Sequence, residues 1–432
     1  MKRNLKIWLL CLIVMAVIFR LNCSPIEAYD LNFERYRMDN GVNLLFKYIP
    51  DSQVCSINIF VKVGSYDEEK QNNGISHLFE HIFFKTSSTI KSDLDNWGAM
   101  ANGETNRDFT RFYLTLPSAN ALEGANLLLR SFFSSDYSPQ DLKLEKTVVL
   151  NEMRMRGEEG GSQMRDRLYQ LAFPFQGYGL PIIGNPGSVS SITQADLQNF
   201  KNHYYSGNRV FWIVTGNFPR QKMLDLLMSK MADLPAGGEV NQNDLVYRFP
   251  NQAKVINGVS PDWGFAMAFW APPAREHKLV ASLDLLYYLL GQGRQCCFNQ
   301  SLPPGTGMIF LTQRHPGLLE IYTSNLKSDE IDKTRDKILE ILYGIARKGV
   351  SASELMRAKA LISTDFLSQQ ESCEGISSTL GFYEAIDEAD FAKDYLKEIQ
   401  KITSDDLARI AGLLLHNGYI MLVRRGVAPS EN

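Results

Sequence analysis

The sequence predicts an α+β fold built from two homologous domains, each a mostly antiparallel sheet packed with helices. Three observations lead to this prediction. The 432 residues exceed one ordinary hydrophobic core and suit two domains of about 200 residues each. Short strand patterns alternate with longer helical patterns along the chain. Two separate features of the first half also recur in the second half at one common spacing.

The recurring features are a helix start and a strand. The pattern Ile-Thr-x-x-Asp-Leu occurs at 192–197 and again at 402–407, which is 210 residues later. At the same spacing, a buried strand pattern that ends near a glycine occurs at 210–216 and again at 420–426. Thr with Asp three residues later is also common helix-capping chemistry, so one match alone could arise by chance. Two matches at one spacing indicate duplication of a domain.

The elements of the first domain follow from local periodicity and turn residues. Pro50, Asp51 and Ser52 separate the first two strands. Strands are expected over Val42–Ile49, Cys55–Val63, Met100–Thr105, Phe109–Leu116 and Val210–Thr215, and helices over Ile75–Phe84, Asp93–Trp97, Ala119–Phe133, Pro139–Arg156, Gln163–Ala172 and Ala195–His203. We place the first domain at 29–235, a polar, glycine-containing linker at 236–247 and the second domain at 248–432.

The N-terminus is typical of a secretory signal peptide. Three basic residues within the first six precede the unbroken apolar run Ile7–Phe19. This run is too short to span a bilayer comfortably, and small-residue cleavage chemistry fits a cut after Ala28. Retention as an uncleaved membrane anchor is the alternative. Lipidation at Cys23 is disfavoured because no small residues precede it.

Charge and cysteine usage exclude other classes. Removal of residues 1–28 takes the net charge from −3 to −6, so nothing basic remains to suggest nucleic acid as a partner. The four remaining cysteines resemble neither a zinc ribbon nor a disulfide framework in their spacing, and their pairing stays open: Cys55, Cys296, Cys297 and Cys373.

The segment Gly74–Phe84 predicts a metal site. On a helix, His77 and His81 lie one turn apart on one face, where both imidazoles can bind one ion. Glu80 shares that face and can reach an attacking water. Two His, a carboxylate and an open position form a catalytic zinc arrangement. The rest of the helix is apolar, where unpartnered polar groups would be costly. Ordinary helix residues are the alternative interpretation of this spacing.

The third ligand is expected from the helix Pro139–Arg156. Glu145 and Glu152 lie on one stripe of it, two turns or roughly 10 Å apart, so one ion does not take both. Spacing alone does not choose between them, and the other acid can orient a ligand. Glu104, Glu158 and Glu159 are weaker candidates, since they have the pattern of solvated positions.

These residues together resemble the pitrilysin/insulinase family of zinc peptidases, over nearly the whole mature chain. The match is to the short bacterial two-domain members, which are similar to mitochondrial processing peptidase subunits. The family carries the inverted HxxEH motif with a later Glu-x6-Glu pair, here Glu145 and Glu152. The resemblance implies that Glu152 is the ligand of the single zinc ion, that Glu145 supports it and that Glu80 is the catalytic base. It also implies the processing-peptidase-like metallohydrolase fold and a periplasmic location.

A second block resembles the family's edge strand, which pairs with the substrate peptide. It runs from Gly98 to Thr110, and by this resemblance Asn102, Gly103 and Thr105 are substrate-binding positions. Gly103 replaces the usual alanine. An exposed edge near the metal would capture an extended peptide through backbone hydrogen bonds, largely independently of sequence.

The second domain departs from the family pattern. Relatives carry an Arg and a Tyr, seven residues apart, that contact the peptide or the developing oxyanion. The equivalent segment here is 302–310, where Pro303 and Phe310 stand in their place, and neither donates a side-chain hydrogen bond. In some bacterial relatives one chain bears the zinc and a partner bears this pair. We therefore expect a homologous partner subunit in a heterodimer, with a homodimer as the alternative.

The sequence thus predicts a zinc-dependent endopeptidase that hydrolyses peptides or unfolded segments, with no stable membrane span after signal removal. Two other classes remain open. One is a zinc-binding but proteolytically silent scaffold subunit of the same fold, which the altered second domain permits. The other is a metal-dependent hydrolase of a non-peptide substrate, against which the edge-strand block argues.

Overall fold

The computed structural model describes residues 30–85, 90–134, 136–158, 160–174, 177–238, 249, 251–257 and 263–426. The expected signal peptide, residues 1–28, lies outside these described residues, as does most of the expected linker, from residue 239 onward. No helix within the described ranges has the length and apolar character needed to cross a membrane.

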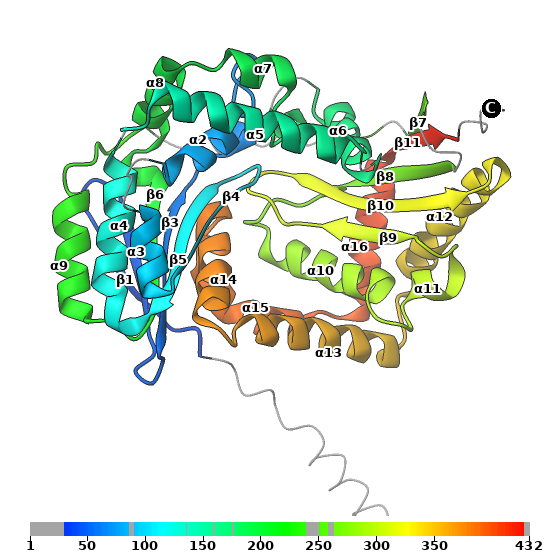
Figure 1. Ribbon diagram of the computed structural model, residues 1–432. Helices are drawn as coiled ribbons and strands as arrows, with labels where there is room; N and C mark the ends of the chain where they lie inside the picture. Colours follow the sequence, from blue (N-terminus) through cyan, green and yellow to red (C-terminus); the bar gives the residue numbers. More distant parts are fainter. Residues whose placement is uncertain are drawn as a thin grey trace, which may run out of the picture. The chain divides into compact units, whose positions relative to one another are not determined.

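The first sheet has six strands in the order β1-β2-β6-β3-β5-β4 (Figure 1). Strands β2 and β6 are parallel, and all other neighbours are antiparallel. The strands are β1 (Glu34–Arg37), β2 (Asn43–Tyr48), β3 (Val54–Val61), β4 (Met100–Thr105), β5 (Thr110–Pro117) and β6 (Val210–Gly216). Strand β4 lies at the edge of the sheet, as the resemblance of this segment to the family's edge strand implies.

The second sheet has five strands in the order β7-β11-β8-β10-β9. Here β7 and β11 are parallel, and the other neighbours are antiparallel. The strands are β7 (Gln252–Asn257), β8 (Trp263–Ala271), β9 (Gly307–Phe310), β10 (Gly317–Leu326) and β11 (Tyr419–Arg425). Five strands of the first sheet have the order β2-β6-β3-β5-β4. The second sheet has the same order with each strand number raised by five, so the two sheets share one topology. The prediction of two homologous domains is therefore confirmed, with β1 as an addition that was not predicted.

Seven helices repeat in the same order around each sheet, and α9 of the first half has no counterpart among the described residues. In the first half they are α2 (Ile75–Phe83), α3 (Ile90–Trp97), α4 (Ala121–Phe133), α5 (Pro139–Glu158), α6 (Gly160–Ala172), α7 (Pro186–Ser191), α8 (Gln194–Tyr204) and α9 (Arg220–Met231). In the second half they are α10 (His277–Gly291), α11 (Cys297–Ser301), α12 (Ile331–Lys348), α13 (Ala352–Gln369), α14 (Cys373–Ile386), α15 (Asp390–Lys401) and α16 (Ser404–Asn417).

The repeated sequence pattern lies at equivalent helices. The Thr193 side chain accepts a hydrogen bond from the backbone N–H of Asp196 at the start of α8, and Thr403 does the same with Asp406 at the start of α16. Each pair forms a capping box, which satisfies backbone donors that the helix leaves unpaired. The pattern is therefore both helix capping and a trace of the duplication.

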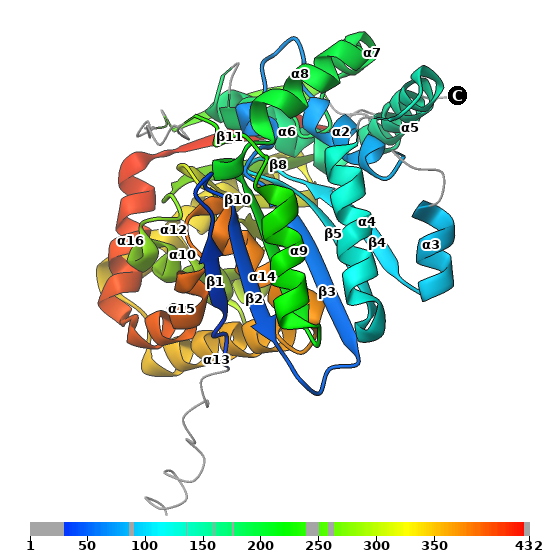
Figure 2. The ribbon, with the colours of Figure 1, turned by 90° about the vertical axis from the view of Figure 1, so that its left-hand side faces the viewer.

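One face of the first sheet is covered by helices of its own half. Figure 2 shows α4 and α9 across this face. Alternate residues of β3, such as Ile57 and Ile59, are fully buried there in a core that also takes Leu128 of α4 and Leu227 of α9. The same core receives the apolar side of α2, and this packing fixes the helix that carries the predicted metal ligands.

The opposite face of the first sheet is covered by α14, which comes from the second half (Figure 1). The Ser377 hydroxyl donates to the Thr215 hydroxyl at 2.8 Å. Gly381 faces the Phe60 ring so closely that a Cβ at this position would lie 2.1 Å from it. Glycine is needed here because the helix lies directly on the aromatic ring.

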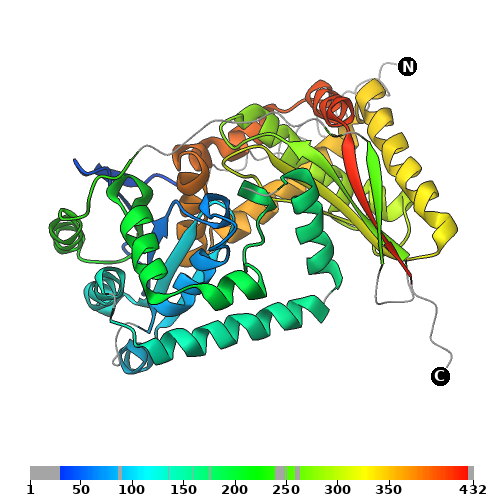
Figure 3. The ribbon, with the colours of Figure 1, turned by 90° about the horizontal axis from the view of Figure 1, so that it is seen from above.

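The second sheet is covered in return by α6, which comes from the first half (Figure 3). Leu168 and Phe173 form a buried cluster with Ala268 of β8 and Leu422 of β11. At its edge, Arg165 pairs with Glu320 at 2.9 Å. Helices α6 and α14 occupy the same place in the element order of their halves, so the two halves exchange equivalent helices.

Candidate metal centre

The helix α2 begins at a tight turn and runs beneath the edge strand. Gly74 precedes it with a φ of +95°, a conformation that side chains disfavour. The apolar residues of α2 are buried in the first core, whereas His81 and Glu80 are only partly buried. The predicted pattern is therefore correct: one face of the helix anchors it, and the other presents two imidazoles and a carboxylate.

The start of α2 is held by Glu68, a buried residue that was not among the predicted site residues. One carboxylate oxygen of Glu68 accepts the N–H groups of Gly74 and of the Asn73 side chain, each at 2.7 Å. The other accepts the N–H of Ser76 at 2.9 Å. Burial raises the pKa of Glu68 to about 7, although these hydrogen bonds favour the ionised form. In the sequence, the indication of this role is an acidic residue six positions before the glycine that precedes the helix.

We expect Glu68→Ala to destabilise the protein by about 3 kcal/mol, because it leaves buried helix donors without an acceptor. The measurement is the free energy of unfolding in denaturant. Glu69→Ala is the control, since this neighbour is exposed and its loss should change stability by less than about 0.5 kcal/mol. Equal stability of the two variants would show that Glu68 does not anchor the helix.

Three predicted ligands meet in one place. His77 Nε2 lies 3.8 Å from one oxygen of Glu152, and His81 Nε2 lies 3.7 Å from the other. A ligand atom from each residue lies within 4.8 Å of the other two. These gaps are too long for hydrogen bonds but close to the spacing of about 3.5 Å between ligands of a tetrahedral zinc ion. Among the residues described, this is the one group with such geometry.

The His77 imidazole has the protonation state that a metal needs. Burial, with smaller effects from His81 and Arg156, lowers the pKa of His77 to about 3, so its ring is neutral at pH 7. A neutral imidazole offers a free lone pair to a metal ion. Glu152 is 38% exposed, so the site remains open to solvent on that side.

Glu145 lies behind His81 rather than beside Glu152. Its Oε2 lies 3.1 Å from His81 Nδ1, and its Oε1 lies 3.0 Å from Lys85 Nζ. A carboxylate on Nδ1 sets the orientation of the ring and leaves Nε2 for the metal. The donor set therefore fits a zinc ion, and Glu145 contacts the nitrogen of His81 that faces away from Glu152.

Glu80 contacts the edge strand. The Thr105 hydroxyl donates to Glu80 Oε2 at 2.8 Å. Burial raises the pKa of Glu80, against the pull of this hydrogen bond. A Cβ on Gly103 would lie 2.5 Å from Glu80 Cγ. The glycine that replaces the expected alanine thus gives the carboxylate room to lie against β4.

The other candidate residues from the sequence that the structure describes are not part of the ligand cluster. Asn102 is exposed on β4, and its side chain accepts the N–H of Gly103 at 2.9 Å. Glu104 points to the opposite face of the sheet from Glu80 and pairs with Arg111 at 2.8 Å. The side chains of Glu158 and Glu159 lie outside the described residues.

Family models match both halves of the chain. Residues 44–186 match the model described as Insulinase (Peptidase family M16), and residues 191–362 match the model described as Peptidase M16 inactive domain. The chain belongs to the insulinase family of peptidases. The resemblance that the sequence motifs suggested is therefore confirmed.

Relatives of this insulinase-family chain include proteins named as zinc proteases. The uncharacterized zinc protease YmxG of Bacillus subtilis is 24% identical over 92% of this chain and 99% of its own. The mitochondrial-processing peptidase subunit beta of Blastocladiella emersonii is 28% identical over 46% of this chain and 44% of its own. A Helicobacter pylori protease structure shares the fold, with a TM-score of 0.82 and 19% identity over 91% of this chain and 99% of that one.

The altered segment of this family member lies at the edge of its second sheet. Pro303 follows α11, and Phe310 ends the edge strand β9. Neither side chain has a hydrogen-bond donor. Phe310 lines a cavity that Glu104 and Asn106, at the end of β4, also line. Phe310 therefore faces the same cavity as the end of β4.

Proposed function

We propose that this chain is a zinc-dependent endopeptidase that cleaves extended peptide segments bound along β4. His77, His81 and Glu152 hold one zinc ion, and Glu80 is the general base. When bound, the zinc supplies a Lewis acid that polarises the scissile carbonyl and acidifies water. The observation that carries the proposal is the position of Glu80, because its carboxylate accepts a hydrogen bond from the edge strand and also interacts electrostatically with His81 and Glu152.

The chain's own residues move the proton. Glu80 takes a proton from water as the water oxygen attacks the carbonyl carbon. It then delivers this proton to the nitrogen as the C–N bond breaks, so base and acid are one group. The Thr105 hydroxyl holds the carboxylate toward the strand on which the peptide lies. Backbone groups along β4 align the peptide, because an edge strand leaves them unpaired.

A partner chain supplies the substrate contacts that this chain lacks. Pro303 and Phe310 remove two donors at the expected positions, and an oxyanion donor is typically worth about 3–4 kcal/mol in catalysis. One relative is named as a subunit, which supports a two-chain enzyme. A zinc-binding scaffold without peptidase activity remains the alternative function. The residues Pro303 and Phe310 favour this alternative if no partner chain restores hydrolysis.

The test is hydrolysis of internally quenched peptides by the purified mature chain, alone and mixed with a homologous subunit from the same cells. We expect slow hydrolysis by the chain alone. Addition of the partner should raise the rate by roughly a hundredfold or more, because the partner supplies a hydrogen-bond donor for the oxyanion. A chelator should abolish hydrolysis, and added zinc should restore it.

Three results separate the possibilities. Full activity of the chain alone would exclude the divided site. Hydrolysis that persists after complete zinc removal would exclude the metal mechanism. Zinc binding without hydrolysis in every preparation would favour the scaffold.

A further inference from the structure

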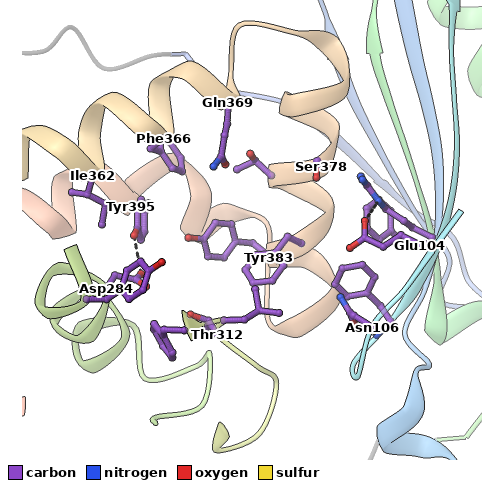
Figure 4. A pocket seen from close by; sticks show the side chains of 18 of the residues that line it. Glu104, Asn106, Asp284, Thr312, Ile362, Phe366, Gln369, Ser378, Tyr383 and Tyr395 are labelled. Carbon is purple, nitrogen blue, oxygen red and sulfur yellow. Dashed lines mark hydrogen bonds and ion pairs between the residues drawn. The ribbon is translucent and has the colours of Figure 1, made fainter. Parts of the chain in front are cut away.

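A second site lies on the face of the first sheet away from the metal. A cavity of about 380 Å³ lies between the end of β4, the helix α14 and the helices of the second half. Figure 4 shows Glu104 and Asn106 on one side of this cavity and Asp284 and Tyr395 on the other. The cavity is open to solvent, and its walls come from both halves of the chain.

The geometry of β4 connects this cavity with a bound peptide. Side chains of a strand alternate between the two faces of a sheet. Gly103 and Thr105 face Glu80, whereas Glu104 faces the cavity. A peptide that pairs with the β4 edge continues this alternation, so every second substrate side chain points toward the cavity rather than toward the metal.

The inner wall combines aromatic rings with one carboxyl group. Asp284 lies deep in the protein yet remains partly exposed to the cavity. It accepts one hydrogen bond, from the Tyr395 hydroxyl at 2.8 Å. Among the described residues, no Lys, Arg or His acts on the charge of Asp284, although a buried carboxylate normally has such a partner. Burial raises the pKa of Asp284 to about 7, in keeping with a missing cation.

The other charges of the cavity are already paired. Arg111 bridges Glu104 at 2.8 Å and Glu374 at 3.1 Å, so it is not available to Asp284. Tyr287 and Tyr383 also line the cavity, and aromatic faces attract cations. A cationic group would therefore find both a carboxyl without a basic partner and aromatic rings.

We propose that this cavity is a substrate subsite for a lysine or arginine side chain, held by Asp284 and the surrounding aromatic rings. The inference rests on the proposed capture of peptides by β4. The subsite would select peptides by a residue that does not face the metal. Because its walls come from both halves, an occupied subsite would also link the two halves across the substrate.

The experiment measures peptide binding without turnover. Fluorescent peptides that carry a single lysine are compared with otherwise identical peptides that carry norleucine, which lacks only the amine. Binding is measured by anisotropy on the zinc-loaded Glu80→Gln protein, with the lysine moved along the peptide. We expect at least about tenfold tighter binding for lysine at alternate positions. Adding Asp284→Asn should reduce this preference to less than about twofold.

Two controls identify the group responsible. Asp225→Asn removes one exposed carboxylate on α9 and should keep the lysine preference. Tyr395→Phe keeps the carboxyl group of Asp284 but removes the hydrogen bond that favours its ionised form, so it should weaken the lysine preference without abolishing it. Equal binding of both peptides by the parent, or a preference that survives Asp284→Asn, would overturn the subsite. Tighter binding of norleucine would make the cavity an apolar pocket and would also overturn it.

Hydrolysis by the protein with Glu80 intact separates this failure from that of the proposed function. If both peptides are cleaved at equal rates, the peptidase stands and the subsite fails. If neither peptide is bound or cleaved in any preparation, both proposals fail.

Discussion

Replacing Glu80 with glutamine should leave zinc bound and reduce peptide hydrolysis by about 10²–10⁴-fold. The amide has almost the same shape and can still accept a hydrogen bond from the Thr105 hydroxyl, which now donates at 2.8 Å to the carboxylate. It cannot accept the proton of an attacking water. The measurement is kcat/KM on a quenched peptide, in whichever preparation hydrolyses peptides, together with zinc content.

Glu123→Gln is the matched control for this change. Glu123 is an exposed carboxylate on α4 that is not part of the ligand cluster, and its loss should leave both activity and zinc content unchanged. If Glu80→Gln retained activity within about tenfold of the parent, another group would have to be the base. If it lost its zinc, Glu80 would be part of the binding site instead.

Replacing His77 with alanine should nearly abolish zinc binding at neutral pH. In the proposed site, His77 supplies one of the three ligand atoms that the described residues bring together, and its buried ring is neutral at this pH. We expect zinc affinity to fall by more than about a hundredfold, beyond the 10–100-fold that loss of an orienting group costs. Metal analysis after dialysis against chelators of increasing strength measures this.

Two further variants make the comparison quantitative. Glu145→Gln should weaken zinc binding by about 10–100-fold, because it alters the group that contacts His81 Nδ1 but removes no ligand. His203→Ala removes an exposed histidine at the end of α8 and should leave the zinc affinity unchanged. If His77→Ala bound zinc as tightly as His203→Ala, the ligand set would be wrong.

The two acids on α5 show how far sequence reasoning can locate this site. Their spacing excludes shared ligation of one ion but cannot decide which acid reaches it, because both lie on one stripe. Only the packing of α5 against α2 decides, and it puts Glu152 opposite both Nε2 atoms and Glu145 behind His81. The family resemblance chose the same residue without that geometry. Glu68 was missed because two of its three hydrogen-bond partners are backbone N–H groups, so only its distance from the start of the helix indicates its role.

The fold was predictable where contacts are local. The expected helix at 75–84 and strand at 100–105 agree with α2 and β4 within one residue, since periodicity and turn residues define them. Strand β1 was not predicted, because its four residues carry little alternation. The exchange of α6 and α14 was also beyond prediction. A helix pattern shows which side is apolar but does not identify the sheet that will cover it.

The reciprocal placement of α6 and α14 makes the two halves mutually dependent. Excision of either half would remove a covering layer from the other and expose apolar strand surface to water. Neither half is thus a candidate for a minimal soluble fragment, and a nick in the connecting segment need not separate them. A half-length precursor could have satisfied the same arrangement by pairing with its own copy across a two-fold axis, with gene fusion later making that pairing permanent.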